Sequence, residues 1–170
     1  MQINGMNKED FMAMFGDVYE HSPWIAAKVW ESGLDAHHDS AEPLAFAFAD
    51  VIHNASREQK LALLQAHPEL AVAVASEHEL SAASRIEQRG AGLDQCSPEE
   101  FAEFRHLNDA YQSRFGFPFI VAVKGMDRRG ILTALKERLS YNKEQEFETA
   151  TEQVIRIGSF RIEGKFEPHG

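Results

Sequence analysis

Three short segments of the chain carry residue types that could do chemistry on a small polar ligand. His67 stands directly before Pro68, residues 84–88 end in a carboxylate and an amide side by side, and residues 115–123 form an apolar run broken by glycine and proline. A titratable ring, adjacent acid and amide groups, and backbone that a proline keeps out of regular hydrogen bonding are the parts of a polar-ligand pocket. Together they indicate where a site lies.

His67 has two interpretations. Proline disfavours the α conformation in the residue before it, so the helix that begins after Ser56 should end around Ala66 or His67. A histidine there can be a simple cap, with its imidazolium stabilised by the negative end of the helix dipole. It can also be a general acid/base, because imidazole has a reference pKa of about 6.5. Spacing alone leaves both interpretations open.

The other candidate residues also have a structural alternative. Ser84, Glu87 and Gln88 recur at three- and four-residue spacing, so a helix would place them on one face, which could line a cleft or meet water. The apolar run can be core, pocket wall or both. Arg161 can anchor an anionic ligand through its bidentate donors, or be a surface cation on an amphipathic helix.

The charge balance excludes several classes of partner. The chain has 17 Lys+Arg against 27 Asp+Glu, a formal net charge of -10, so its overall field repels nucleic acid and anionic membrane surfaces. The longest apolar stretch, residues 44–52, contains Asp50 and is too short to span a bilayer. One cysteine, Cys96, excludes an intramolecular disulfide framework, and no secretory signal is visible, so we expect a cytoplasmic protein.

The spacing of the eight histidines does not predict a metal site. There is no H-E-x-x-H motif, and the adjacent pair His37 and His38 would point in different directions on a regular element, so we expect a solvated turn there. Phosphate-binding and dinucleotide-binding glycine loops are absent as well. The sequence therefore predicts no metal and no cofactor.

Helix signals recur along the whole chain, whereas alternating strand-like runs are almost absent, so we predict an all-α protein with a single compact multi-helix domain over residues 1–170. Capping signals stand at Asn7, Ser22, Ser40, Ser56 and Ser97. The aromatic-rich helix after Ser40 should be buried. Other helices are expected over about 70–76, 81–89, 98–114, 129–139 and 143–161, with a loop or extended segment over 115–123.

Four motifs in order resemble one known family over nearly the whole length. They are H-P-E-L at 67–70, S-R-I-E-Q at 84–88 followed by Ala-Gly-Leu at 91–93, L-N-x-x-Y at 107–111, and F-G-F-P-F-I at 115–120. Together they resemble the 2-oxo-4-hydroxy-4-carboxy-5-ureidoimidazoline (OHCU) decarboxylases of urate breakdown. That resemblance implies an all-α, usually homodimeric, cofactor-free enzyme that converts OHCU into (S)-allantoin and carbon dioxide.

The resemblance also implies roles for particular residues. His67 would be the catalytic acid/base, and we expect Glu87 to orient the substrate beside it. The substrate-binding residues would be Pro68, Ser84, Arg85, Ile86, Glu87, Gln88, Phe119, Ile120, Val121, Ala122, Val123 and, as an addition, Arg161. Two features depart from the family pattern: basic Arg85 and Arg89 flank the Glu-Gln pair, and Ile162 replaces the leucine of a terminal R-L pair.

Two other classes of function remain open at this point. A helical binding module could sequester an anionic heterocycle without turning it over, in which case His67 would be replaceable. A related ureide-pathway hydrolase would need metal ligands, which metal analysis of the purified chain would detect.

Overall fold

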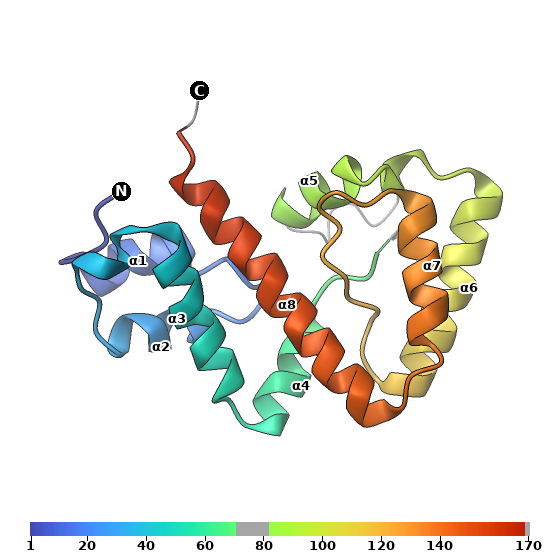
Figure 1. The fold of residues 1–170 in the computed structure, drawn as a ribbon, viewed down its shortest axis with the longest axis horizontal. Helices are drawn as coiled ribbons and strands as arrows, with labels where there is room; N and C mark the ends of the chain where they lie inside the picture. Colours follow the sequence, from blue (N-terminus) through green and yellow to red (C-terminus); the bar gives the residue numbers. More distant parts are fainter. Residues whose placement is uncertain (71–81, 169–170) are drawn as a thin grey trace. The chain divides into compact units, whose positions relative to one another are not determined.

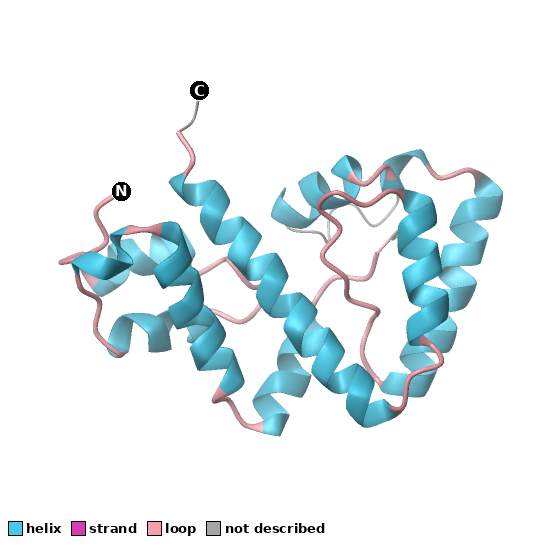
Figure 2. Ribbon diagram, viewed as in Figure 1, coloured by secondary structure: helices cyan, strands magenta, loops and turns pink. Residues whose placement is uncertain are grey.

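The computed structural model describes residues 1–70 and 82–168, except for the side chains of residues 82, 83, 85 and 94. Every regular element in these ranges is a helix (Figure 2), which confirms the all-α prediction. The helix expected over 70–76 lies outside the described residues. Contacts divide the chain into two compact units, Met1–Ala66 with Ile155–Gly170, and His67–Val154. The long helix α8 contributes residues to both.

The first unit is built from short helices around an aromatic core. The rings of Phe11 and Phe15 lie 5.0 Å apart, and Phe48 lies 6.3 and 6.2 Å from them, with Tyr19 at its other side. All four side chains are buried. The helices of this unit (Figure 1) are α1 Lys8–Phe15, α2 Trp24–Glu31, the 3-10 turn η1 Ala36–Asp39, α3 Ala41–His53, α4 Arg57–Ala66 and the second part of α8 Lys143–Phe166.

The capping signals predict helix starts well. Asn7 Oδ1 accepts from the Asp10 N–H at 2.8 Å, as an N-cap should. Ser56 and Gln59 form the expected reciprocal pair, at 3.1 and 3.0 Å. The Ser22 prediction is wrong by one residue: Pro23 is the N-cap of α2, because the Ser22 hydroxyl turns back and donates to the Glu20 carbonyl at 3.2 Å.

The expected burial of the aromatic-rich helix α3 is only partly right. Phe48 is buried together with Leu44 and Ile52, one turn away on either side, but Phe46 is 74% exposed. Residues two positions apart on an α-helix point in nearly opposite directions, so Phe46 faces outward when Phe48 faces the core. The aromatic composition of α3 suggested that the helix is buried, whereas its helical period leaves one of its faces outside the core.

Gly158 in α8 has a packing role. A Cβ added there would lie 2.0 Å from the Tyr19 hydroxyl and 2.4 Å from its ring carbon. Because Tyr19 is itself buried in the aromatic core, we expect Gly158→Ala to destabilise the protein by about 1–3 kcal/mol. Gly164→Ala is the matched control, since nothing lies within 4 Å of the added atom. Urea unfolding should show the control unchanged or slightly stabilised; equal stability of both variants would contradict this packing.

Asp39 ties the N-terminal residues to the first unit. Its Oδ1 accepts the N–H groups of Ile3 and Asn4 at 2.5 and 2.7 Å, and these bonds lower its pKa below 3.8. A lowered acid pKa contributes stability that is complete above the ordinary value and is lost as the pH falls through the folded-state pKa. The stability difference between the wild type and Asp39→Asn should therefore be largest near neutral pH and narrow in strong acid. Urea unfolding across pH measures it, and a difference that does not vary with pH would contradict the assignment.

The second unit surrounds an extended segment with helices. Its helices are α5 Ala82–Gly90, the 3-10 turn η3 Leu93–Gln95, α6 Pro98–Phe115, α7 Arg128–Arg138 and the first part of α8. The capping box at Ser97 and Glu100 is present, and α6 ends next to Gly116, as predicted. Helices α6 and α7 lie side by side, and residues 116–127 connect them without helix, which confirms the expected loop (Figure 1). Helix α8 continues to Phe166, five residues beyond the expected end.

None of the described helices combines the length and apolar character that crossing a bilayer requires.

Candidate active site

The segment His67–Leu70 begins where α4 ends, as the proline rule predicts. His67 and Pro68 are partly exposed, whereas Leu70 is buried. Two side-chain amides hold the backbone that follows His67 and Pro68. Gln88 Nε2 donates to the Glu69 carbonyl at 3.4 Å, and Asn108 Nδ2 donates to the Leu70 carbonyl at 3.0 Å. The histidine therefore stands at the start of a backbone turn that is fixed from two other helices.

Helix α5 turns part of its polar face inward. Ser84 and Gln88 are 3% and 8% exposed and Glu87 is half-buried, so this face is not a solvated one. Ile86 is 71% exposed on the other side of the helix. The side chain of Arg85 is outside the described part. Because Gln88 reaches the Glu69 carbonyl, the structure brings the 84–88 segment against the segment that carries His67.

The segment Phe119–Val123 is extended and largely buried. Phe119 and Ile120 are fully buried, Ala122 and Val123 nearly so, and Val121 is partly exposed. Its main chain is held at two points: Ala122 N–H donates to Gln153 Oε1 at 2.9 Å, and the Ile120 carbonyl accepts from the Arg138 guanidinium. The segment is thus part of the core, and side chains hold its backbone at Ile120 and Ala122, while the Val123 carbonyl accepts from the Met126 N–H at 2.9 Å.

Glu69, two residues after His67, has a carboxyl group with a raised pKa. Burial of Glu69 raises its pKa above the ordinary 4.5, the Asp109 carboxylate raises it further, and Arg105 opposes both effects. A raised acid pKa means that the folded protein holds this proton more tightly than the unfolded chain does. The turn after His67 is therefore partly desolvated.

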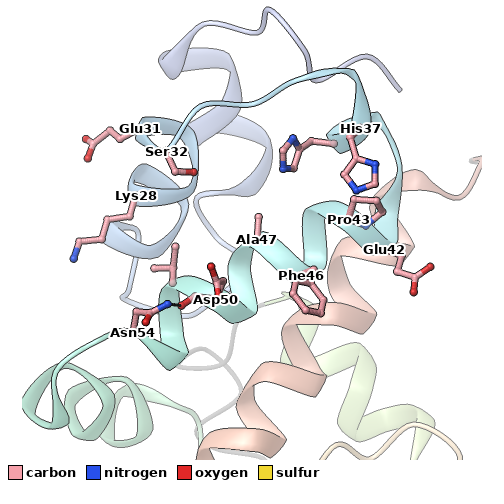
Figure 3. A pocket seen from close by; sticks show the side chains of 12 residues that line it. Lys28, Glu31, Ser32, His37, Glu42, Pro43, Phe46, Ala47, Asp50 and Asn54 are labelled. Atoms are coloured by element: carbon pink, nitrogen blue, oxygen red, sulfur yellow. Dashed lines mark hydrogen bonds between the residues drawn. The ribbon is translucent and has the colours of Figure 1, made fainter.

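A groove of about 910 Å³ lies elsewhere, in the first unit, between α2, η1 and α3 (Figure 3). It contains none of the predicted site residues. Its lining mixes acids, a lysine and apolar side chains, and Asn54 in it donates to the Asp50 carbonyl at 2.8 Å. His37 and His38 lie at its edge on η1, where Asp35 caps the turn. His38 Nδ1 lies 3.1 Å from Asp35 Oδ1 at this edge, but none of the motif residues lines the groove, so it is not the candidate catalytic site.

Within residues 1–70 and 82–168, no group of three or more His, Cys, Asp or Glu side chains is arranged to hold a metal ion.

Comparison with known proteins identifies the family. The model of the family described as OHCU decarboxylase matches residues 4–163. The chain belongs to the OHCU decarboxylase family. This confirms the family that the four sequence motifs indicated, and it makes the chain a member of a family of carboxy-lyases.

Individual relatives span nearly all of the chain. The 2-oxo-4-hydroxy-4-carboxy-5-ureidoimidazoline decarboxylase of Halalkalicoccus jeotgali is 38% identical over 161 residues, covering 95% of this chain and 88% of the relative. The enzyme of the same name from Haloferax volcanii is 36% identical over 165 residues, covering 97% and 94%.

Two solved structures share the fold. An (S)-allantoin synthase is similar with a TM-score of 0.72 at 29% identity, covering 94% of this chain and 51% of that one. A crystal structure of OHCU decarboxylase in the presence of (S)-allantoin is similar with a TM-score of 0.71, covering 94% of this chain and 99% of that one. At 22% identity, the second likeness is one of fold alone.

Arg161 of this OHCU decarboxylase family member lies in the first unit, on α8. Its Nη1 donates to the Val18 carbonyl at 2.7 Å, and its Nη2 lies 3.0 Å from the Glu20 carboxylate. The side chain is only 6% exposed, so the surface-cation interpretation is wrong. A role for Arg161 toward a ligand stays a prediction.

Sequence reasoning missed several residues that hold the site segments. Asn108 and Tyr111 belong to the L-N-x-x-Y motif, which served only to indicate the family, although a spacing of three already places them on one face of α6. Arg138 and Gln153 fix the Phe119–Val123 backbone from α7 and α8. No local signal marks these two, because their partners are distant in sequence and lie on a loop.

Proposed function

We propose that this chain is an OHCU decarboxylase, which converts 2-oxo-4-hydroxy-4-carboxy-5-ureidoimidazoline into (S)-allantoin and carbon dioxide in urate degradation. The observation that carries the proposal is the contact between Gln88 and the Glu69 carbonyl, which joins the two motif segments bearing His67 and Glu87 within a chain of this family. A titratable ring and a half-buried carboxylate on two adjoining segments suit a reaction that consists of breaking one carbon–carbon bond and moving protons.

The substrate supplies its own electron sink. Its carboxylate sits on a ring carbon that bears a hydroxyl and adjoins a carbon doubly bonded to nitrogen. When carbon dioxide leaves, the bonding pair forms a carbon–carbon double bond and the C=N pair moves to nitrogen, which takes a proton. The resulting enol then gives up its hydroxyl proton while the neighbouring carbon gains one, and the product is allantoin. The protein must therefore orient, desolvate and move protons, and no cofactor is required to stabilise a carbanion.

His67 and Glu87 share the central roles in this scheme. Both would hydrogen-bond the hydroxyl region of the substrate and so orient the carboxylate for loss. His67 would then assist proton transfer as the enol collapses. Delivery of the final proton to one face of the ring would give a single enantiomer.

The remaining site residues would bind the substrate. Gln88 and the backbone of Phe119, Ile120, Val121, Ala122 and Val123 would hold the ureido and ring amides. Pro68, Ser84 and Arg85 would complete the walls around His67 and Glu87, whereas Ile86, 71% exposed on the other side of α5, would not face the substrate with its side chain. Arg161 stays a predicted substrate-binding residue, and its guanidinium pairs with Glu20 in the first unit. These assignments extend the family motif residue by residue onto this sequence.

We further infer that the enzyme is a cytoplasmic homodimer. The single cysteine fits a reducing compartment, and the acidic surface fits a protein that binds neither nucleic acid nor membranes. The exposed ring of Phe46 on α3 is a large apolar group that a subunit interface would cover. Sedimentation of the wild type and of Phe46→Asp measures the number of chains per particle. A homodimer predicts two chains for the wild type and a lower average number for Phe46→Asp.

The activity is tested by adding the purified chain to freshly generated OHCU and following carbon dioxide release. A decarboxylase accelerates the release in proportion to enzyme concentration, and dialysis against a chelator leaves the rate unchanged. A binding module would slow or leave unchanged the spontaneous decay, and a metal-dependent hydrolase would lose its activity on dialysis. Either result would refute the proposal.

A further inference from the structure

A buried ion pair lies behind the Phe119–Val123 segment. Arg138 on α7 and Glu146 on α8 are 6% and 0% exposed, and the Arg138 Nε donates to Glu146 Oε1 at 2.7 Å. Tyr111 on α6, fully buried, donates its hydroxyl to the same carboxylate oxygen. Three helices of the second unit therefore contribute to one polar cluster, which we call the Arg138 cluster.

The Arg138 cluster contacts the extended segment at two consecutive residues. Arg138 Nη1 donates to the Ile120 carbonyl, and the guanidinium carbon lies 4.6 Å from the centre of the Phe119 ring. Tyr111 packs its ring edge against Phe119 as well, with ring centres 5.4 Å apart. One planar cation thus fixes both the side chain and the main chain at the start of the segment.

Stability alone does not account for this arrangement. Replacing a buried ion pair by apolar residues of similar size is often neutral or stabilising, because desolvation offsets the attraction. Here Glu146 Oε2 also finds no hydrogen-bond partner among the described residues, while Arg138 Nη2 contacts the same Oε1 atom that Nε already bonds. The pair also orients the backbone, because the rigid donor fork of the arginine sets where the Ile120 carbonyl points.

We propose that Arg138 is a positioning residue for substrate binding, which holds the Phe119–Val123 backbone in the geometry that the substrate amides require, with Glu146 and Tyr111 fixing its guanidinium. This rests on the proposed function, in which that backbone binds the ureido and ring amides. The Gln153 bond to Ala122 holds the other end of the same segment, so that Val121 lies between two fixed points.

The test is Arg138→Lys, which keeps the buried positive charge but loses the fork that bonds Glu146 and the Ile120 carbonyl together. We expect KM for OHCU to rise about tenfold, because one charged hydrogen bond that positions the backbone is lost, while kcat stays within about threefold, because His67 and Glu87 are untouched. Tyr111→Phe, which removes only the outer bond to Glu146, should raise KM less. A KM within a factor of two of the wild type in folded Arg138→Lys overturns the proposal.

Arg114→Lys is the matched control. Arg114 also donates to a backbone carbonyl, that of Tyr141 at 2.9 Å, and also lies over a phenylalanine ring, that of Phe115 at 5.1 Å. It contacts neither His67–Leu70, residues 84–88 nor Phe119–Val123 in these bonds, so its replacement should leave KM unchanged. An equal rise of KM in both variants would mean a general loosening of the unit and would refute a specific role for Arg138.

A second readout separates this proposal from the proposed function. Amide hydrogen exchange of a peptide covering residues 117–123 should be about tenfold faster in Arg138→Lys than in the wild type or Arg114→Lys. If the wild type fails to decarboxylate OHCU but this exchange difference appears, the proposed function is wrong and the positioning of the segment stands. If the wild type is active and exchange is unchanged, the positioning role is wrong.

Discussion

Replacing His67 by alanine is expected to lower the rate of OHCU decarboxylation by about 10²- to 10⁴-fold with little loss of stability. A positioned acid/base typically contributes a factor of that order. Folding should be spared because His67 is only partly buried and because Gln88 and Asn108 hold the backbone after it. Steady-state kinetics and urea unfolding of the same preparation measure the two effects.

His106→Ala is the matched control for this prediction. His106 is an exposed histidine on α6, in the same unit, and takes no part in the proposed site. Its replacement should leave both rate and stability unchanged. Wild-type turnover by His67→Ala would remove His67 from the mechanism and return it to the simple capping role that its position at a helix end also allows.

Glu146→Ala is expected to have the largest effect on stability, about 3–5 kcal/mol. The carboxylate is fully buried and accepts hydrogen bonds from Tyr111 and Arg138. Its removal leaves the guanidinium charge buried without its partner, and breaking a buried ion pair on one side costs that much. The midpoint of urea unfolding should fall accordingly.

Glu103→Ala isolates the effect of burial. Glu103 on α6 pairs with Lys136 on α7 at 2.7 Å, but the two side chains are 44% and 56% exposed. A solvent-exposed pair contributes about 1 kcal/mol or less, so this variant should unfold close to the wild type. Similar losses in both variants would show that the burial of Glu146 and Arg138 adds nothing to the cost of separating them.

The helix boundaries were predictable because their signals are local. Ser56 and Ser97 each cap a helix through a partner three residues away, and Pro68 ends α4 by restricting the residue before it. Such effects act within one turn of chain and are visible in sequence. The error at Ser22 also has a local cause, because its hydroxyl donates to the Glu20 carbonyl, two residues earlier, instead of capping the helix.

The outward position of Phe46 and the division into two units depend on packing across the chain. Composition favoured burial of the whole aromatic-rich helix, but only the face with Phe48 meets the core. Which face of a helix is covered is decided by its neighbours, and those are separated from it by loops. The helical period of α3 puts Phe46 and Phe48 on opposite faces, but it does not say which face meets the core.

The segments of the candidate site could be picked out from the sequence, but the residues that hold them could be picked out only in part. The motifs around His67 and Glu87 indicated two segments, and the Gln88 bond joins them. Arg138, by contrast, is an arginine near a helix end with nothing in its neighbourhood to mark it. Its role depends on α7 and α8 lying close to the Phe119–Val123 loop, and the spacing of residues in the sequence does not show that these elements meet.

The most direct test of the account is the optical activity of the product. Freshly generated OHCU is mixed with the wild type, with His67→Ala or with buffer, and circular dichroism is followed as carbon dioxide is released. The account predicts that the wild type forms (S)-allantoin in excess at a rate proportional to enzyme, and that His67→Ala forms it at least about 10²-fold more slowly. Racemic allantoin at the spontaneous rate in the presence of the wild type would contradict it.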